Sequence, residues 1–291
     1  MSARALAPEP LKHAARHACL KVGEATASMR LQPSFILVGA QRCGTTSLFR
    51  ALMTHPQVVR PVLHKGINYF DVNYYRSFRW YCAHFPIAEI AERKAARYGG
   101  PAAAFEASGY YLYHPFALER VAHDLPGVKL VAMLRDPVER AFSAYKHEYA
   151  RGFDRESFEK ALELEDDRLA GEVGRMRHDP SYQSLSHRHH SYRHRGHYAE
   201  QLERAFDLFP RAQVHIIDSE TYFDQPELEY RSLLAFLDLQ PFKPPGFGRH
   251  NARPGPPMKA ETRRALAEYY APHDERLAKL LGRPLRWVRK A

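Results

Sequence analysis

A short apolar run that leads into a glycine-bracketed loop constrains the fold more than any other part of this sequence. Residues 35–39 read Phe-Ile-Leu-Val-Gly and have the composition of a strand buried on both faces. Gly39 and Gly44 enclose four residues, and apolar side chains at helical spacing follow between Thr45 and Met53. The sequence therefore predicts a strand, a tight loop and a helix, whose backbone N–H groups and helix N-terminus bind an anion.

The rest of the chain predicts further strands that alternate with helices. Apolar runs predict strands at 103–106, 129–134 and 214–217, and helical patterns predict helices at 196–209, 227–237 and 259–281, the last interrupted at Pro272. The sequence shows no internal repeat. We therefore expect an α/β protein with a P-loop-like three-layer fold, in which helices flank a central parallel sheet.

Three regions are expected to add to this framework. Residues 1–30 have weak periodicity and predict a basic N-terminal extension, while 31–291 predict one domain. Residues 155–200 are highly charged and rich in histidine, so we expect helix and loop on the surface there. The many Pro and Gly residues of 241–257 predict a long loop.

Composition limits the partners and the compartment. The net charge of +10 favours anionic partners without identifying them. The three cysteines have no regular spacing, which disfavours a disulfide framework and a structural zinc site. No segment has the apolar length of a secretory signal core or a membrane span, so we expect a soluble, cytoplasmic protein without a transmembrane segment.

The loop differs from that of ATP-using proteins at the position after Gly44. A kinase-type loop has lysine there, whereas this sequence has Thr45, and its cation is Arg42, two residues before the glycine. A glycine pair of this spacing also occurs in turns that bind nothing. The arginine, the two threonines and the strand-to-helix context favour the anion-binding interpretation.

A second motif follows the strand expected at 129–134. Asp136, Pro137 and Glu139 are typical of a helix start, and they place Arg135 at the carboxyl end of that strand. Because ligands of doubly wound sheets bind at the carboxyl ends of the strands, Arg135 and Ser143 are candidates to hold a second phosphate. By itself the motif is better explained by Arg135 pairing with Asp136 or Glu139, and by Ser143 as a small packing residue.

Taken together, the loop, the following His55-Pro56 and the Arg135–Ser143 motif resemble the sulfotransferases that use 3'-phosphoadenosine 5'-phosphosulfate (PAPS). The similarity is greatest to bacterial members and to those that modify heparan sulfate glucosamine. The resemblance implies that Arg135 and Ser143 hold the 3'-phosphate, and that Arg253, in a late segment similar to one that covers the cofactor, makes a further contact. It also implies that the 5'-phosphosulfate is held by Arg42, Cys43, Gly44, Thr45, Thr46 and Ser47.

The sequence departs from this family at three positions. Arg42 replaces the usual lysine, Gly66 occupies the place of a catalytic glutamate in the heparan enzymes, and Ala107 stands where relatives have lysine. Because the acceptor must lose a proton during transfer, another group is needed in place of the glutamate. The remaining candidates for a catalytic role are Glu106, His64 and Lys65, with Arg42 and Lys65 as groups that stabilise charge on the transferring sulfuryl group.

The resemblance implies transfer of the sulfuryl group from PAPS to a hydroxyl or amine of an acceptor, which is expected to be a saccharide. We expect neither a metal ion nor a nucleic acid to take part. The alternatives are a P-loop kinase or other nucleotide phosphotransferase, and a PAPS-binding protein with weak or no turnover. The segment 187–197 holds five histidines and three arginines, and the arginines disfavour a metal ion. We interpret it as a cationic surface near the acceptor entrance or as a solvated loop; neither acceptor identity nor oligomeric state is indicated.

Overall fold

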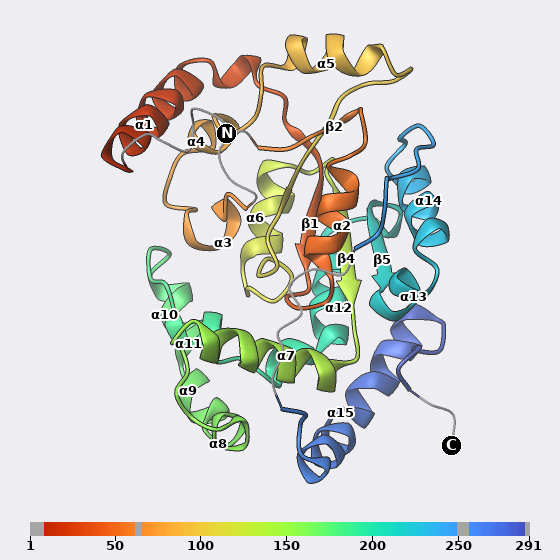
Figure 1. The fold of residues 1–291 in the computed structure, drawn as a ribbon. Helices are drawn as coiled ribbons and strands as arrows, with labels where there is room; N and C mark the ends of the chain where they lie inside the picture. The colour runs from red at the N-terminus through yellow and green to blue at the C-terminus, as the bar shows by residue number, and fades with distance from the viewer. Residues whose placement is uncertain (1–8, 62–65, 249–255, 289–291) are drawn as a thin grey trace.

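A single parallel sheet organises the chain (Figure 1). The computed structural model describes residues 9–61, 66–248 and 256–288, and for 9–15 the backbone only. Five strands pair in the order β2-β3-β1-β4-β5, and all four pairings are parallel. The strands are β1 (Pro33–Gly39), β2 (Val58–Val59), β3 (Ala103–Ala107), β4 (Lys129–Leu134) and β5 (Val214–Asp218).

The central position of β1 explains its composition. It is flanked by β3 and β4, with Leu37 paired to Ala107 and Gly39 to Ala132. Because helices cover both faces, its side chains from Phe35 onward are buried on either side, as the continuous apolar run predicts. The carboxyl ends of β1, β3 and β4 therefore lie together at one edge of the sheet.

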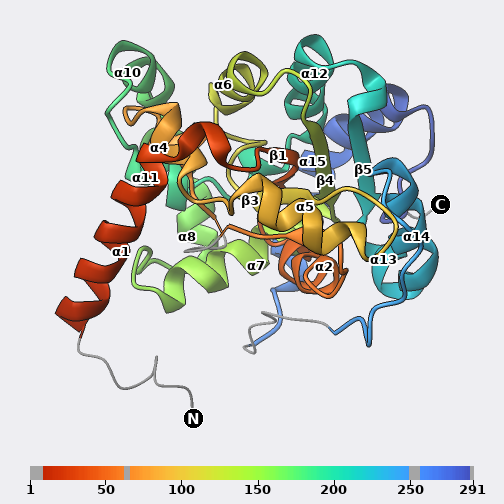
Figure 2. The same cartoon turned by 90° about the horizontal axis from the view of Figure 1, so that it is seen from above.

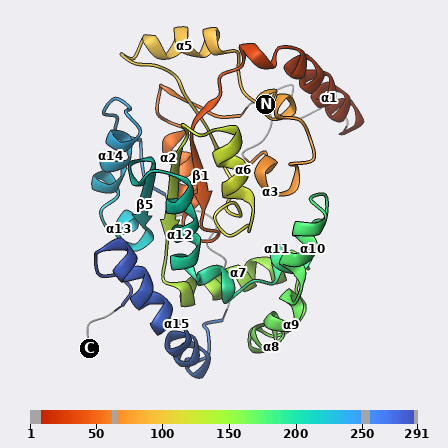
Figure 3. The same ribbon diagram turned by 180° about the vertical axis from the view of Figure 1, so that it is seen from behind.

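Helices form the layers on either side of this sheet. In Figure 2, α2 lies on one face, and α6 and α12 lie on the other. Figure 3 shows α7 crossing below the carboxyl ends of the strands, with α8 to α11 beyond it. The helices are α1 (Glu9–Ala25), α2 (Thr45–Leu52), α3 (Tyr69–Val72), α4 (Phe78–Cys82), α5 (Ala88–Ala96), α6 (Ala117–Asp124), α7 (Pro137–Ala150), α8 (Phe158–Glu163), α9 (Glu165–Leu169), α10 (Glu172–His178), α11 (Leu185–His189), α12 (Tyr198–Leu208), α13 (Ser219–Asp224), α14 (Pro226–Phe236) and α15 (Ala260–Leu281), with short 3-10 turns at Ala27–Met29, His194–Gly196 and Arg211–Gln213.

This architecture confirms the expected fold class, and most predicted elements differ only at their ends. One difference concerns α15, which runs unbroken through Pro272, so the predicted interruption was wrong. Tyr270 and Leu277 are buried on either side of the proline. Their packing holds the helix in place despite the hydrogen bond that proline cannot make.

A second difference concerns residues 155–200, which we expected on the surface. Several polar side chains of this segment are buried, among them Glu165 and Arg195. Glu165 accepts hydrogen bonds from the backbone N–H groups of Arg193 and His194, so part of the charge of this segment is satisfied internally. The expectation that this segment lies on the solvated surface was wrong for these buried residues.

The N-terminal helix α1 lies beside α4. Gly23 is close enough to Ala83 that a Cβ atom on it would lie 2.7 Å from the alanine side chain, which indicates a tight contact. The boundary near residue 30 remains a prediction. In the described part of the chain, no helix combines the length and apolarity that crossing a bilayer requires.

Candidate functional site: the loop between β1 and α2

The glycine loop connects β1 to α2 at the carboxyl end of the sheet. The N–H of Ala40 donates to the carbonyl of Met133 on β4 at 2.8 Å, which ties the start of the loop to the neighbouring strand. Arg42 and Gly44 have φ angles of 70° and 93°, in the left-handed region that glycine adopts most easily. Gly44 directly precedes α2, so the loop turns sharply into the N-terminus of the helix, as predicted.

The loop residues expected to hold the phosphosulfate divide into two groups. The side chains of Cys43 and Ser47 are buried, whereas Arg42, Gly44, Thr45 and Thr46 are partly exposed. Burial raises the pKa of the Cys43 thiol to about 11, although Arg140 and the Tyr198 hydroxyl, 3.6 Å from the sulfur, oppose this rise. The thiol therefore belongs to the core, and any contact of Cys43 with an anion involves its backbone.

The second motif lies directly beside this loop. Asp136 caps α7 by accepting from the N–H of Val138 at 2.8 Å, which confirms the predicted helix start. Arg42 donates from Nε to the Ser143 hydroxyl at 3.1 Å, and Arg135 Nη1 lies 3.5 Å from the carbonyl oxygen of Arg42. The structure thus brings together the two motifs expected to bind the two ends of one anionic cofactor.

Arg135 also has the acidic neighbour that the alternative interpretation requires. Its Nη2 lies 3.8 Å from Glu139, and each side chain is about one-third exposed. A contact at this distance and exposure contributes little energy in water. The Arg135 guanidinium is therefore open to a better anionic partner, such as a phosphate group.

Glu106 is completely buried. It is not among the residues that line the cavity next to Gln41 of the loop, which is described below. Burial raises the pKa of its carboxyl group to about 8, an effect that Tyr111 and the backbone of Ile67 only partly offset. This position does not support direct proton transfer from an acceptor to Glu106. His64, Lys65 and Arg253, the other predicted site residues, lie outside the described residues.

Two departures from the family pattern touch each other. A Cβ atom placed on Gly66 would lie 2.8 Å from the carbonyl oxygen of Ala107. A glutamate at position 66 would therefore require the backbone to move. The neighbouring position 107 holds alanine in place of the lysine that the resemblance leads us to expect.

A cavity of about 160 Å³ lies beside the loop, and it contains residues that the sequence analysis did not single out. Ser108 lines it, immediately after β3, and its hydroxyl donates to Asp71 Oδ2 at 3.1 Å. Burial raises the pKa of Asp71 to about 6, while the N–H of Val72, Arg188 and Ser108 oppose the rise. The position of Ser108 at the carboxyl end of a core strand was the signal that could have identified it.

The His/Arg-rich segment forms another wall of this cavity. Gln41 in the loop accepts a hydrogen bond from Arg195 and donates to Glu148 at 3.3 Å. His189 lies 2.9 Å from the same carboxylate, and His187 lies 2.7 Å from the Tyr110 hydroxyl. The segment is therefore not a free loop, because Arg195, His189 and His187 are hydrogen-bonded next to the phosphate-binding loop.

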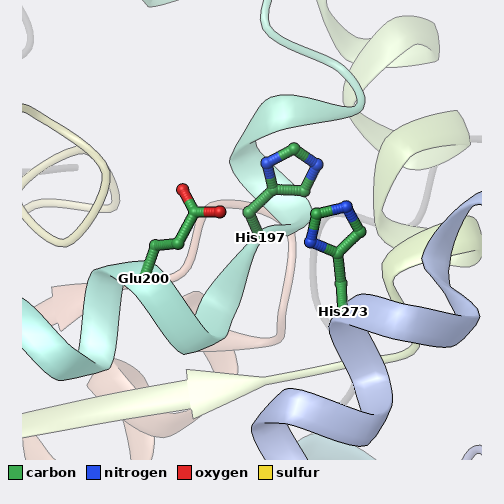
Figure 4. A group of neighbouring side chains, drawn as sticks. All are labelled: His197, Glu200 and His273. Atoms are coloured by element: carbon green, nitrogen blue, oxygen red, sulfur yellow. The ribbon is translucent and has the colours of Figure 1, made fainter.

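Three possible metal ligands, the first of them at the end of this segment, meet where α12 faces α15: His197, Glu200 and His273 (Figure 4). The two imidazole rings are stacked, with centroids 3.9 Å apart and an interplanar angle of 8°. Imidazole nitrogens bind metals in the ring plane, and the in-plane lone pairs of parallel rings do not converge. Arg276 also lies 3.7 Å from Glu200, and we assign no metal ion to this group.

Comparison with known proteins identifies the family. A family model described as "Sulfotransferase domain" matches residues 32–244. The chain belongs to the sulfotransferase family. A solved structure of a sulfotransferase from Alicyclobacillus acidocaldarius is 30% identical, with a TM-score of 0.65, over 88% of this chain and 98% of that one. The expected family and the expected fold are therefore confirmed.

Two curated relatives extend this comparison. The membrane-associated sulfotransferase kil1 of Dictyostelium discoideum is 28% identical over 88% of this chain. The human bifunctional heparan sulfate N-deacetylase/N-sulfotransferase 3 is 28% identical over 89% of this chain. This sulfotransferase chain spans 66% of the length of the first relative and 31% of the second.

Proposed function

We propose that this chain transfers the sulfuryl group of PAPS to a hydroxyl or amine of a carbohydrate acceptor. The proposal depends mainly on the contacts that join the loop to Arg135 and Ser143. This arrangement suits a single ligand that carries phosphate groups at both ends. The names of the heparan sulfate relatives support a carbohydrate acceptor.

We also propose a cytoplasmic location, which cell fractionation with a chain-specific antibody would test.

The proposed reaction is an in-line transfer at sulfur. The acceptor oxygen or nitrogen forms a bond to sulfur as the bond between sulfur and the bridging oxygen of PAPS breaks. Adenosine 3',5'-bisphosphate leaves with the electron pair of that bond. Arg42 and the loop N–H groups stabilise the charge that develops on the bridging oxygen, and Arg135 and Ser143 hold the 3'-phosphate.

The acceptor proton requires a group other than the missing glutamate. In our proposal the Ser108 hydroxyl receives this proton while passing its own to Asp71, to which it is hydrogen-bonded. Ser108 is the group exposed to the cavity, and Asp71 acts through it. Asp71→Asn should therefore lower kcat for sulfuryl transfer roughly 100-fold and change its pH profile, with adenosine 3',5'-bisphosphate affinity unchanged; an unchanged kcat would exclude this route.

Calorimetry separates the proposed activity from the kinase alternative. We expect adenosine 3',5'-bisphosphate to bind without added Mg²⁺ and more tightly than ATP, since Thr45 replaces the lysine of ATP-binding loops. A preference for ATP with Mg²⁺ would overturn the proposal. Tight binding of the bisphosphate without any labelled product from radiolabelled PAPS would instead indicate a binding protein.

A further inference from the structure

Three arginine side chains line the cavity beside the loop. The described residues that line it include Gln41, Asn68, Ser108, Arg151, Arg188 and Arg195. The three arginines come from the end of α7 and from the His/Arg-rich segment. At about 160 Å³ the cavity has space for about five waters or for one carboxylate or sulfate group with its remaining hydration.

Two of these arginines lack an acidic partner within the described chain. Arg188 is half-buried, and its guanidinium makes no hydrogen bond or ion pair with any described residue. Arg195 is only 2% exposed; it donates to Gln41 and to the carbonyls of His187 and Arg188, and its Nε has no partner in the described structure. A buried guanidinium without a carboxylate is costly unless an anion approaches it.

Two carboxylates contact residues that line the cavity, and both already have hydrogen-bond partners. Glu148 accepts from His189 at 2.9 Å and from Gln41 at 3.3 Å, and Arg151 lies 3.5 Å from it. Asp71 accepts from Ser108 and from the N–H of Val72, and its attraction to Arg188 acts over a longer distance. The cavity therefore has an excess of positive charge.

The cavity and the second motif contact different residues of the loop. Gln41 faces the cavity, whereas Arg42, the next residue, contacts Ser143 on the side assigned to the cofactor. Arg135 and Ser143 do not line the cavity, so a group bound in it would not occupy the proposed 3'-phosphate site. The ligand that can reach both the sulfuryl group and this cavity is the acceptor.

We propose that this cavity is an anion subsite, in which Arg188 binds a carboxylate or sulfate group that the acceptor carries near its reacting hydroxyl or amine. The inference rests on the proposed function and adds the acceptor's charge to it. Arg195 positions Gln41 and contributes to the positive potential, while Arg188 makes the contact. The subsite selects acidic acceptors over neutral ones of the same shape.

The test measures binding of three small saccharide probes while adenosine 3',5'-bisphosphate saturates the nucleotide site. Methyl β-glucuronide carries a carboxylate, glucose 6-sulfate carries a sulfate ester, and methyl β-glucoside is neutral. Saturation-transfer NMR gives the Kd of each for the wild type, Arg188→Gln, Arg188→Lys and the control Arg231→Gln. Arg231 is exposed on α14, so its removal lowers the net charge equally at a distant site.

We expect at least one acidic probe to bind about tenfold more tightly than the neutral one, which corresponds to one charge-assisted contact. Which acidic probe binds distinguishes a carboxylate from a sulfate ester. Arg188→Gln should abolish the preference, Arg188→Lys should retain part of it, and Arg231→Gln should leave it intact.

Equal binding of the three probes would overturn the inference, as would an unchanged preference in Arg188→Gln. Loss of bisphosphate binding in Arg188→Gln would place this residue in the nucleotide site and also overturn it. Failure of the wild type to bind the bisphosphate would instead contradict the proposed function itself, so the two failures are distinguishable.

Discussion

The pH dependence of protein stability can show whether the carboxyl group of Glu106 has a structural or a catalytic role. Glu106 is 0% exposed, and burial raises its pKa from 4.5 to about 8. Below about pH 4.5 the group is neutral in both the folded and the unfolded chain and does not oppose folding. As pH rises from 4.5 to 8, the unfolded chain ionises while the folded chain stays protonated, so the free energy of unfolding falls.

The change Glu106→Gln removes this titration with little change in shape. The two pKa values differ by roughly 3.5 pH units, and each unit is worth about 1.4 kcal/mol. Relative to wild type, the free energy of unfolding of the variant should therefore rise by up to about 4 kcal/mol between about pH 5 and about pH 8.5. Its affinity for adenosine 3',5'-bisphosphate should not change, because Glu106 is fully buried and does not line the cavity.

Urea denaturation followed by circular dichroism at several pH values measures this difference directly. Glu163→Gln is the matched control, since it makes the same chemical change on the exposed surface of α8, where no burial opposes the charge. A Glu106→Gln curve that follows the wild type would refute the reasoning. It would mean that Glu106 is charged in the folded protein at neutral pH.

Three further outcomes follow from the site. Arg135→Ala should weaken adenosine 3',5'-bisphosphate binding about 10- to 100-fold by calorimetry, because a charge-assisted phosphate contact is lost, and unchanged affinity would contradict the assigned 3'-phosphate role. Gly66→Ala should lower the free energy of unfolding by about 1–3 kcal/mol in urea, since its Cβ would lie 2.8 Å from the Ala107 carbonyl; a neutral substitution would show that this contact relaxes easily. Of the three cysteines, Cys19 alone should react quickly with a thiol reagent in the native protein, because Cys43 and Cys82 are buried and burial raises the pKa of both to about 11. Rapid reaction of a second thiol would argue against this packing.

The sequence predicted the parts of the fold that depend on local patterns. The run at Phe35, the cap at Asp136 and the glycine at position 44 each act within a few residues, so the strand, the helix start and the loop could be predicted. The continuity of α15 through Pro272 could not, because packing of distant residues decides it. Likewise, the charged residues of 155–200 gave no sign that Glu165 and Arg195 would find partners inside the protein.

In the candidate site, too, the sequence predicted the features that depend on local patterns and missed those that depend on distant contacts. The two phosphate-binding motifs follow strands, so their meeting at one edge of the sheet follows from topology alone. The pairing of Ser108 with Asp71 joins β3 to α3, and Gln41 joins the loop to Arg195 across most of the chain. These contacts arise only when the sheet is assembled, which explains why Glu106 was expected in the crevice and Ser108 was not.

The measurement that tests the central claim most directly is transfer of radiolabelled sulfuryl from PAPS without added metal. The acceptors are N-desulfated heparan sulfate and a total polysaccharide extract, and Arg135→Ala is the control. The account predicts labelled polysaccharide with the wild type and at least about tenfold less with the variant. No labelled product from any acceptor, or equal labelling by both proteins, would contradict it.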